Sequence, residues 1–343
     1  MATMADVAKH AGVSLSTVSY VLSGKRSISE QTRLRVLSAI EATNFAPNAR
    51  GQALASRRSR TIVLLFPALA HDLGGMNIEF VYGMLQAARE RSYSVMISVS
   101  DDPYEETERA ARRGFADGVL VMEVELADPR VALLQAREFP FALIGHQEDN
   151  TGINFVDFDF ADAVEQSLDH LVGLGHRRIG LALPLIPTRT ATYGPAIRTR
   201  MAFHAGLAAR GLTGDLFVCP STATGGYDTV SRAIATDPTL TGIIANSPQL
   251  VPGMLHAARD AGLRVPDDLS IISLASPMVA EAASPPLTAV DLPAAEMGRL
   301  GATMLIDVLE HGARGRPAQY LLKGALTVRA TTAWAPANVT SGR

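Results

Sequence analysis

Hydroxyl side chains are concentrated in one short stretch near the N-terminus, between residues 14 and 20. Ser14, Ser16, Thr17 and Ser19 are followed directly by the phenol of Tyr20. Serine and threonine hydroxyls can hydrogen-bond to phosphate oxygens and to base edges without placing a charge at the contact. The stretch contains no Cys, His, Asp or Glu, so it offers neither a metal-ligand set nor an acid–base pair. The chemistry that it favours is hydrogen bonding to a nucleic acid.

Three short helices are predicted around these hydroxyls. Thr3 and Asp6 form a capping-box-like start, Gly12 ends the first helix, Ser14 can cap the second, and a third begins near Ser29. The side chains expected to face inward are Val7, Ala8 and Ala11, then Val18, Val21 and Leu22, then Val36, Leu37 and Ile40. Two short helices joined by a tight glycine turn, with a third behind them, are typical of a helix-turn-helix unit.

The second helix of such a unit lies in the major groove of DNA, with its N-terminal residues at the base edges. We therefore expect Leu15, Ser16 and Tyr20 to read bases. Ser14, Thr17 and Ser19 are positioned for contacts with the DNA backbone. A three-helix cap that binds no DNA is the alternative interpretation of this segment.

The charge of the chain is divided unevenly along its length. Residues 1–60 contain nine Lys or Arg and three Asp or Glu, whereas the remainder contains 22 basic and 31 acidic residues. The head therefore carries +6 and the body −9, although the whole chain carries only −3. A basic head on an acidic body favours a polyanionic partner for the head alone. A solvated charged surface is the alternative.

The stretch "DVAKHAGVSLSTVSYVLSG" (residues 6–24) resembles the N-terminal signature of the lac repressor family of bacterial regulators, D-V-A-x-x-A-G-V-S-x-x-T-V-S-x-V-L. The resemblance implies a helix-turn-helix DNA-binding domain at residues 1–46. It continues into a hinge segment at 47–59, where Pro47, Asn48 and Leu54 match the pattern P-N-x-x-A-R-x-L. Gly51 and Gln52 depart from the usual Ala-Arg pair.

In the family the hinge forms a short helix in the minor groove, where its leucines wedge between base pairs. The resemblance therefore implies DNA contacts for Asn48, Arg50 and Leu54, with Leu54 as the wedge. A glycine inside a helix costs about 1 kcal/mol relative to alanine. Gly51 should therefore make the hinge less helical without DNA. A flexible basic linker is the alternative.

From residue 61 onward, apolar strand patterns such as "TIVLLF" and "DGVLVM" alternate with helical patterns, which predicts parallel sheets with crossover helices. The pattern restarts after "INFVDFDF" and predicts two similar α/β lobes. Three further stretches, "HLVGLGHRRIG", "AGLRVPDDLSIISL" and "PPLTAVDLPAAEMG", also resemble the lac repressor family. The implied fold is an all-α headpiece plus a two-lobed, periplasmic-binding-protein-like (type I) effector domain.

The effector and dimerisation domain is placed at 60–332. Its first lobe is expected at about 60–158 and 290–322, its second lobe at about 159–289 and 323–332, and a tail at 333–343. The tail contains no leucine heptads, so the tetramer-forming tail of some family members is not expected.

A ligand of such a domain lies beyond the carboxyl ends of the strands. The candidate residues there are His71, Asp101, Glu123 and His146 in the first lobe, and Arg198, Arg200, Asn246 and Ser276 in the second. Each is also compatible with an ordinary surface residue. The family's sugar-binding acids correspond to Ser247 and to Ala275, and its arginine to Thr199. Since carboxylates bind sugar hydroxyls by charge-assisted hydrogen bonds, we expect no ordinary sugar held in the family manner.

Catalytic patterns are missing from the sequence. It contains neither G-x-S-x-G nor G-x-x-x-x-G-K, and its eight histidines lack metal-ligand spacing, so we predict no enzymatic activity and no cofactor. The single Cys219 cannot form an intrachain disulfide. No signal-peptide pattern or membrane-length apolar run is found, and a cytoplasmic protein is expected.

Together these patterns predict a sequence-specific transcriptional regulator. It would act as a repressor that binds a near-palindromic operator as a homodimer and responds to a small-molecule effector between its lobes. A solute-binding protein, or an α/β enzyme with an accessory helical head, remains the alternative.

Overall fold

The computed structural model describes residues 2–23, 26, 28–45, 59–66, 75–100, 102–112, 115–185, 192–312 and 315–337. The chain forms two units, Met1–Ser59 and Arg60–Arg343, which are described separately below. Five predicted site residues lie outside the described residues: Asn48, Arg50, Leu54, His71 and Asp101. Among the described helices, none is both long enough and apolar enough to cross a lipid bilayer.

The first unit contains the three short helices α1 (Met4–Ala11), α2 (Leu15–Ser23) and α3 (Glu30–Thr43). Thr3 and Asp6 form a reciprocal capping box, and Gly12 ends α1 with a left-handed φ of 62°. The side chain of Ser29 caps α3 by accepting from the Thr32 N–H. The buried core consists of Val7, Ala8, Ala11, Val18, Val36 and Ala39.

The prediction that Leu37 belongs to this core is wrong. The side chain of Leu37 is 42% exposed, and Ala39 is buried instead. Val36, Ala39 and Ile40 share one face of α3, whereas Leu37 is rotated about 100° away from Val36. The face of α3 that packs against the other two helices is therefore narrower than the spacing of its apolar residues predicted.

The second unit contains two mainly parallel sheets, each of six strands in the described residues. The first has the order β11-β5-β4-β3-β1-β2. Its strands are β1 (Thr61–Leu65), β2 (Ser94–Ser98), β3 (Gly118–Met122), β4 (Phe141–Ile144), β5 (Phe155–Phe158) and β11 (Gln319–Leu322). Helices α5 (Met76–Glu90) and α13 (Ala294–His311) pack on one face. Helices α6 (Pro103–Ala110) and α7 (Pro129–Ala136) pack on the other.

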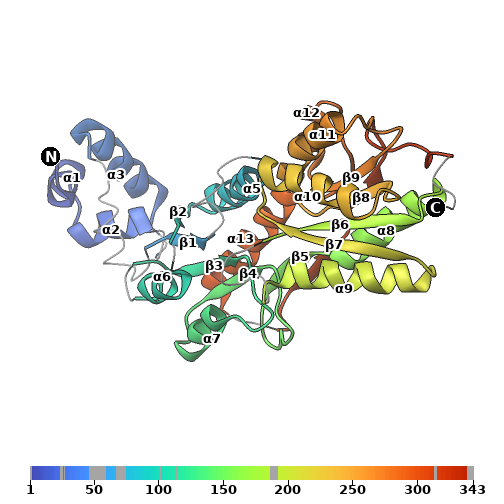
Figure 1. The fold of residues 1–343 in the computed structure, drawn as a ribbon. Coiled ribbons are helices and arrows are strands. Elements are labelled where there is room, and N and C mark those ends of the chain that lie inside the picture. The colour runs from blue at the N-terminus through green and yellow to red at the C-terminus, as the bar shows by residue number, and fades with distance from the viewer. Residues whose placement is uncertain are drawn as a thin grey trace. The chain divides into compact units, whose positions relative to one another are not determined.

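The second sheet has the order β12-β10-β9-β8-β6-β7. Its strands are β6 (Arg178–Pro184), β7 (Thr213–Cys219), β8 (Gly242–Ala245), β9 (Ser270–Ala275), β10 (Thr288–Asp291) and the antiparallel β12 (Leu326–Thr327). Helices α8 (Phe160–Gly173) and α9 (Gly194–Ala209) cover one face (Figure 1). The other is covered by α10 (Ala223–Thr236) and α11 (Val251–Asp260), with the short elements η2 (Pro248–Leu250) and α12 (Pro277–Ala282) nearby (Figure 1).

The chain passes between the lobes at three places: from β5 into α8, from β10 into α13, and from β11 into β12. Strand β10 pairs with β9 as far as Asp291, which lies opposite Ala275. The second sheet therefore extends two residues beyond the expected border at 289. The first lobe is completed by a segment that follows the second lobe in sequence.

Two glycines allow α13, the helix that returns to the first lobe, to pack closely against α5. A Cβ on Gly83 would lie 1.8 Å from the Ala295 carbonyl oxygen, and one on Gly298 would lie 2.0 Å from the Phe80 oxygen. Both distances are far below van der Waals contact, so only glycine permits this backbone approach. Helices α5 and α13, more than 200 residues apart in sequence, thereby pack as one layer of the first lobe.

Candidate DNA-binding surface and ligand cleft

The N-terminal turn of α2 presents most of the predicted DNA-contacting side chains to solvent. Leu15 is 53% exposed, and Ser14 and Ser16 are also exposed. Thr17, Ser19 and Tyr20 are half-buried, because the same helix packs its Val18 into the core. The orientation suits a helix that meets a groove with its first turn.

The hydroxyl of Ser14 has a structural task in this turn. Its Oγ accepts from the Thr17 N–H at 3.2 Å and lies 2.8 Å from the hydroxyl oxygens of both Ser16 and Thr17. Three hydroxyls are thus linked at the start of α2. This linkage orders the side chains before any partner arrives.

Two arginines that the sequence analysis counted only as charge have specific positions. The Arg26 guanidinium lies over the Tyr20 ring, 5.8 Å from its centroid, and so adds a cation beside a predicted base-reading residue. Arg35 donates from Nη2 to the carbonyl oxygens of Ala11 at 2.5 Å and Gly12 at 3.0 Å. Arg35 thereby holds the turn between α1 and α2. Because Arg35 is 24 and 23 residues from these acceptors, its contacts leave no local signal in the sequence.

In the second unit, the predicted first-lobe residues lie at strand ends. Glu123 directly follows β3 and adopts a left-handed φ of 54°. His146 follows β4, and its Nδ1 lies 2.7 Å from Oδ2 of Asp157 on β5. The ring of His146 also stacks on Phe155, with centroids 5.1 Å apart.

Asp157 was not predicted as a site residue, although it is a carboxylate inside a buried strand. It is almost fully buried, and its Oδ1 accepts from the Phe158 N–H at 2.7 Å. Both carboxylate oxygens are therefore held. The signal in the sequence was the acid within the apolar run "INFVDFDF".

A buried ion pair fixes the backbone around Glu123. Arg130 and Asp128 have side chains 2% and 0% exposed, with Nη2 2.6 Å from Oδ2 and Nε 2.9 Å from Oδ1. The same Nη2 donates to the carbonyl oxygens of Met122 and Glu123 at 3.0 Å each. Burial on its own would raise the pKa of Asp128, but the hydrogen bond and charge of Arg130 outweigh it and hold that pKa below its ordinary value of 3.8.

The second lobe presents amide and hydroxyl groups. Oδ1 of Asn246, after β8, lies 3.2 Å from the Thr199 hydroxyl on α9. Ser276, after β9, is fully buried; its hydroxyl caps α12 and donates to the Glu79 carboxylate on α5. An acid does therefore stand beside Ser276, but it comes from the first lobe. Glu79 and Thr199 were not among the predicted residues.

Arg198 and Arg200 point in different directions. Nη2 of Arg198 donates to the carbonyl oxygens of His146 at 2.8 Å and Gln147 at 3.3 Å, across the boundary between the lobes. Arg200 is exposed and lies beside Leu216 and Val218 of β7. Two residues along a helix rotate a side chain by about 200°, so the two arginines leave different sides of α9. Arg200 therefore lies apart from Arg198, and its place in a ligand site stays a prediction.

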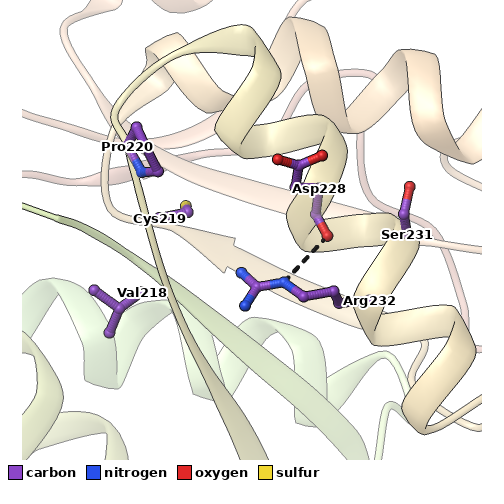
Figure 2. Close-up of a pocket in the computed structure, with 6 residues that line it drawn as sticks. All are labelled: Val218, Cys219, Pro220, Asp228, Ser231 and Arg232. Atoms are coloured by element: carbon purple, nitrogen blue, oxygen red, sulfur yellow. Dashed lines mark hydrogen bonds between the residues drawn. The ribbon is translucent and has the colours of Figure 1, made fainter.

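A pocket of about 430 Å³ lies elsewhere on the second lobe, between the end of β7 and α10 (Figure 2). Its lining residues are Val218, Cys219, Pro220, Asp228, Ser231 and Arg232. None of them was predicted to bind a ligand. Burial raises the pKa of the Cys219 thiol, which disfavours the reactive thiolate. Among the described residues, no cluster of His, Cys, Asp or Glu is suited to hold a metal ion.

Comparisons with known proteins agree on both units. Residues 3–48 match the family described as "Bacterial regulatory proteins, lacI family", and residues 168–332 match "Periplasmic binding protein-like domain". The HTH-type transcriptional regulator MalR of Streptomyces coelicolor is 31% identical over 97% of this chain and 97% of its own length.

Two solved structures extend over both units. The transcriptional regulator CelR–cellobiose complex has a TM-score of 0.70 at 26% identity and covers 96% of this chain and 100% of its own. The lac repressor dimer bound to operator and an anti-inducer has a TM-score of 0.83 and covers 97% of this chain and 99% of its own. At 23% identity the second likeness concerns the fold alone.

Proposed function

The chain belongs to the lacI family of bacterial regulatory proteins, and on that premise we propose that it is a repressor that binds a near-palindromic operator as a homodimer. As a member of that family it is a DNA-binding transcriptional regulator under the control of a small molecule. The single observation that carries the proposal is the exposed first turn of α2, with its linked hydroxyls, on a basic head. We assign it no catalytic activity and propose that it acts on operator DNA in the cytoplasm.

For the homodimer, we propose that a second copy of the chain covers an apolar surface on the first lobe. Ile78, Tyr82 and Leu85 lie on one face of α5, and Met96, Ile97 and Val99 lie on or next to the neighbouring edge strand β2. All six are between 41 and 58% exposed. Among the described strands, β2 is at the edge of its sheet, and exposed apolar groups at such an edge favour burial by a partner. Two copies would supply the two heads that a near-palindromic operator requires.

For the effector we propose a hydroxyl-bearing small molecule between the lobes. Asn246, Thr199 and Ser276 would contact it from the second lobe, and His146 and Glu79 from the first. A related regulator, CelR, binds cellobiose in its solved structure, which supports a ligand rich in hydroxyl groups. Because Ser247 and Ala275 replace the family acids, we still expect free hexoses and pentoses to bind poorly.

Selection of genomic fragments by the full-length protein, followed by footprinting, tests the proposal. We expect a protected near-palindrome with half-sites about one helical turn apart, bound at least about a thousandfold more tightly than scrambled DNA of equal length. The comparison should be made at one fixed salt concentration, because phosphate contacts make affinity depend on salt. Equal affinity for every fragment and for scrambled DNA would contradict the proposal.

A further inference from the structure

The two lobes of the second unit are joined by a seam at the start of α9. The backbone N–H of Leu126, after β3 of the first lobe, donates to the Thr192 carbonyl oxygen at 2.9 Å. The N–H of Gly194 donates back to the Val124 oxygen at 3.2 Å. The first turn of α9 is thereby attached to the lobe opposite the one on which the rest of the helix packs.

Arg198, one turn further along α9, extends this seam with its side chain. The side chain of Arg198 is only 19% exposed, and burial lowers its pKa although the charges of Asp157 and Glu148 act in the opposite direction. Its Nη2 donates to the two carbonyl oxygens of His146 and Gln147. Every one of these partners belongs to the first lobe, whereas the backbone of Arg198 belongs to the second.

A second nitrogen of the Arg198 guanidinium, Nη1, is buried and makes no hydrogen bond among the described residues. It lies 3.8 Å from Oδ2 of Asp157, which is an ion-pair distance but too long for a hydrogen bond. A buried guanidinium is tolerated only while its partners are in place, because its desolvation is costly. Separation of the lobes would remove those partners and return Arg198 to water.

Asp157, the acidic partner of Arg198, lies close to one of the places where the chain crosses between the lobes. Asp157 is on β5, the strand from which the chain crosses into α8, and its carboxylate is fixed by His146 and by the Phe158 N–H. A second lobe-to-lobe bond, from Ser276 to Glu79, joins α12 to α5. The charged side chain of Arg198 therefore belongs to the second lobe, whereas the oxygen atoms around it, from His146, Gln147 and Asp157, belong to the first.

We propose that Arg198 is a clasp that sets the balance between closed and open arrangements of the two lobes, and that its release opens the cleft. Its Nη2 donates to the first lobe, so we assign Arg198 the part of coupling lobe movement to operator affinity rather than of binding the effector. The coupling to DNA rests on the proposed function. The clasp itself rests on the geometry of the second unit alone.

The test measures the distance between the lobes in the full-length protein by double electron–electron resonance. Spin labels are attached through Gln135→Cys on α7 and Ala208→Cys on α9, both exposed positions on different lobes. The native Cys219 is buried and should not be labelled. Arg198→Met is compared with Arg200→Met, which removes a guanidinium from the other side of the same helix.

Arg198→Met should raise the ratio of the open to the closed population by about tenfold or more, because it removes two charge-assisted hydrogen bonds. Arg200→Met should leave the distance distribution as in the native protein. Arg198→Lys keeps the charge but loses the planar fork, and should fall between the two. If Arg198→Met fails to fold, Arg198→Lys and Asp157→Asn decide the question by the same measurement. A native distance distribution in every folded Arg198 variant would overturn the clasp.

The same variants test separately whether Arg198 controls the opening of the lobes and whether that opening changes operator affinity. Distances are measured without DNA, so failure to find an operator would leave that result intact. If an operator is found, Arg198→Met should change its affinity several-fold while Arg200→Met does not. A shifted distance with unchanged operator affinity would overturn the coupling and leave the clasp as a feature of the lobes alone.

Discussion

Replacing Asp128 by asparagine tests how firmly the end of β3 is held. Asparagine preserves the shape of the side chain and an acceptor for the cap of α7, but it removes the charge opposite Arg130. The guanidinium would remain buried without a counter-charge. Breaking a buried pair in this way costs about 3–5 kcal/mol. That is a large share of a typical free energy of unfolding, about 5–15 kcal/mol.

The control for this substitution is Glu108→Gln, which breaks the exposed ion pair with Arg137. Exposed pairs contribute about 0–1 kcal/mol, so the control should unfold in urea almost as the native protein does. Asp128→Asn should unfold at clearly lower urea, and adding Arg130→Met should restore part of the loss. If Asp128→Asn costs no more than Glu108→Gln, the pair does not hold this strand end.

The dependence on pH follows from the lowered pKa of Asp128. Because the folded-state pKa lies below the ordinary 3.8, the contribution of the carboxylate is fully present above that value and is lost as the pH falls through the lower one. The stability difference between native protein and Asp128→Asn should therefore be constant from neutral pH to about pH 5 and should shrink below pH 4. A difference that grows on acidification would refute the assignment.

Four further outcomes are expected. Tyr20→Ala should lower the ratio of operator to scrambled-DNA affinity while leaving weak non-specific binding intact, since phosphate contacts dominate the latter; an unchanged ratio in gel shifts would remove Tyr20 from the base-reading set. Leu54→Ala should weaken operator binding and reduce the DNA bend at an unchanged melting temperature, whereas Gly51→Ala should tighten binding; a loss of about 2–5 kcal/mol in stability with an unchanged bend would instead show that Leu54 is a core residue. Gly298→Ala, whose Cβ would meet the Phe80 oxygen, should cost about 1–3 kcal/mol by thermal unfolding, while Gly173→Ala, with open space around its Cβ, should cost almost nothing. Common free hexoses and pentoses should leave the melting temperature unchanged, and a clear shift with any of them would contradict the inference drawn from the missing acids.

Local signals in the sequence predicted most elements of the fold. Gly12 and Ser29 mark helix ends because their conformations and hydrogen bonds depend on residues three or four positions away. Apolar runs such as "GVLVM" mark strands because both faces of a parallel sheet are covered. Leu37 was misplaced because apolar spacing alone does not say how wide a face the neighbouring helices can bury.

The contacts between the polar side chains of the proposed cleft could not be predicted, because they join residues far apart in the chain. Glu79 and Ser276 are 197 residues apart, and Thr199 and Asn246 are 47 apart. Such pairs leave no periodicity that a local pattern could reveal. Arg198 and Arg200 could not be separated until the orientation of α9 was known, since two residues of rotation place them on different sides of the helix.

The Glu79 carboxylate comes from the first lobe, and this affects how a ligand could bind between the lobes. When the acid and the residues it helps to orient belong to one lobe, a ligand can bind that lobe first and draw in the other. Here the Glu79 carboxylate belongs to the first lobe and accepts from Ser276 of the second. If the proposed effector binds here, a hydroxyl that replaces Ser276 on this carboxylate oxygen would break a lobe-to-lobe hydrogen bond, and recognition would then be linked to lobe movement. Together with the proposed role of Arg198, the free energy of ligand binding would then act on the balance between open and closed lobes.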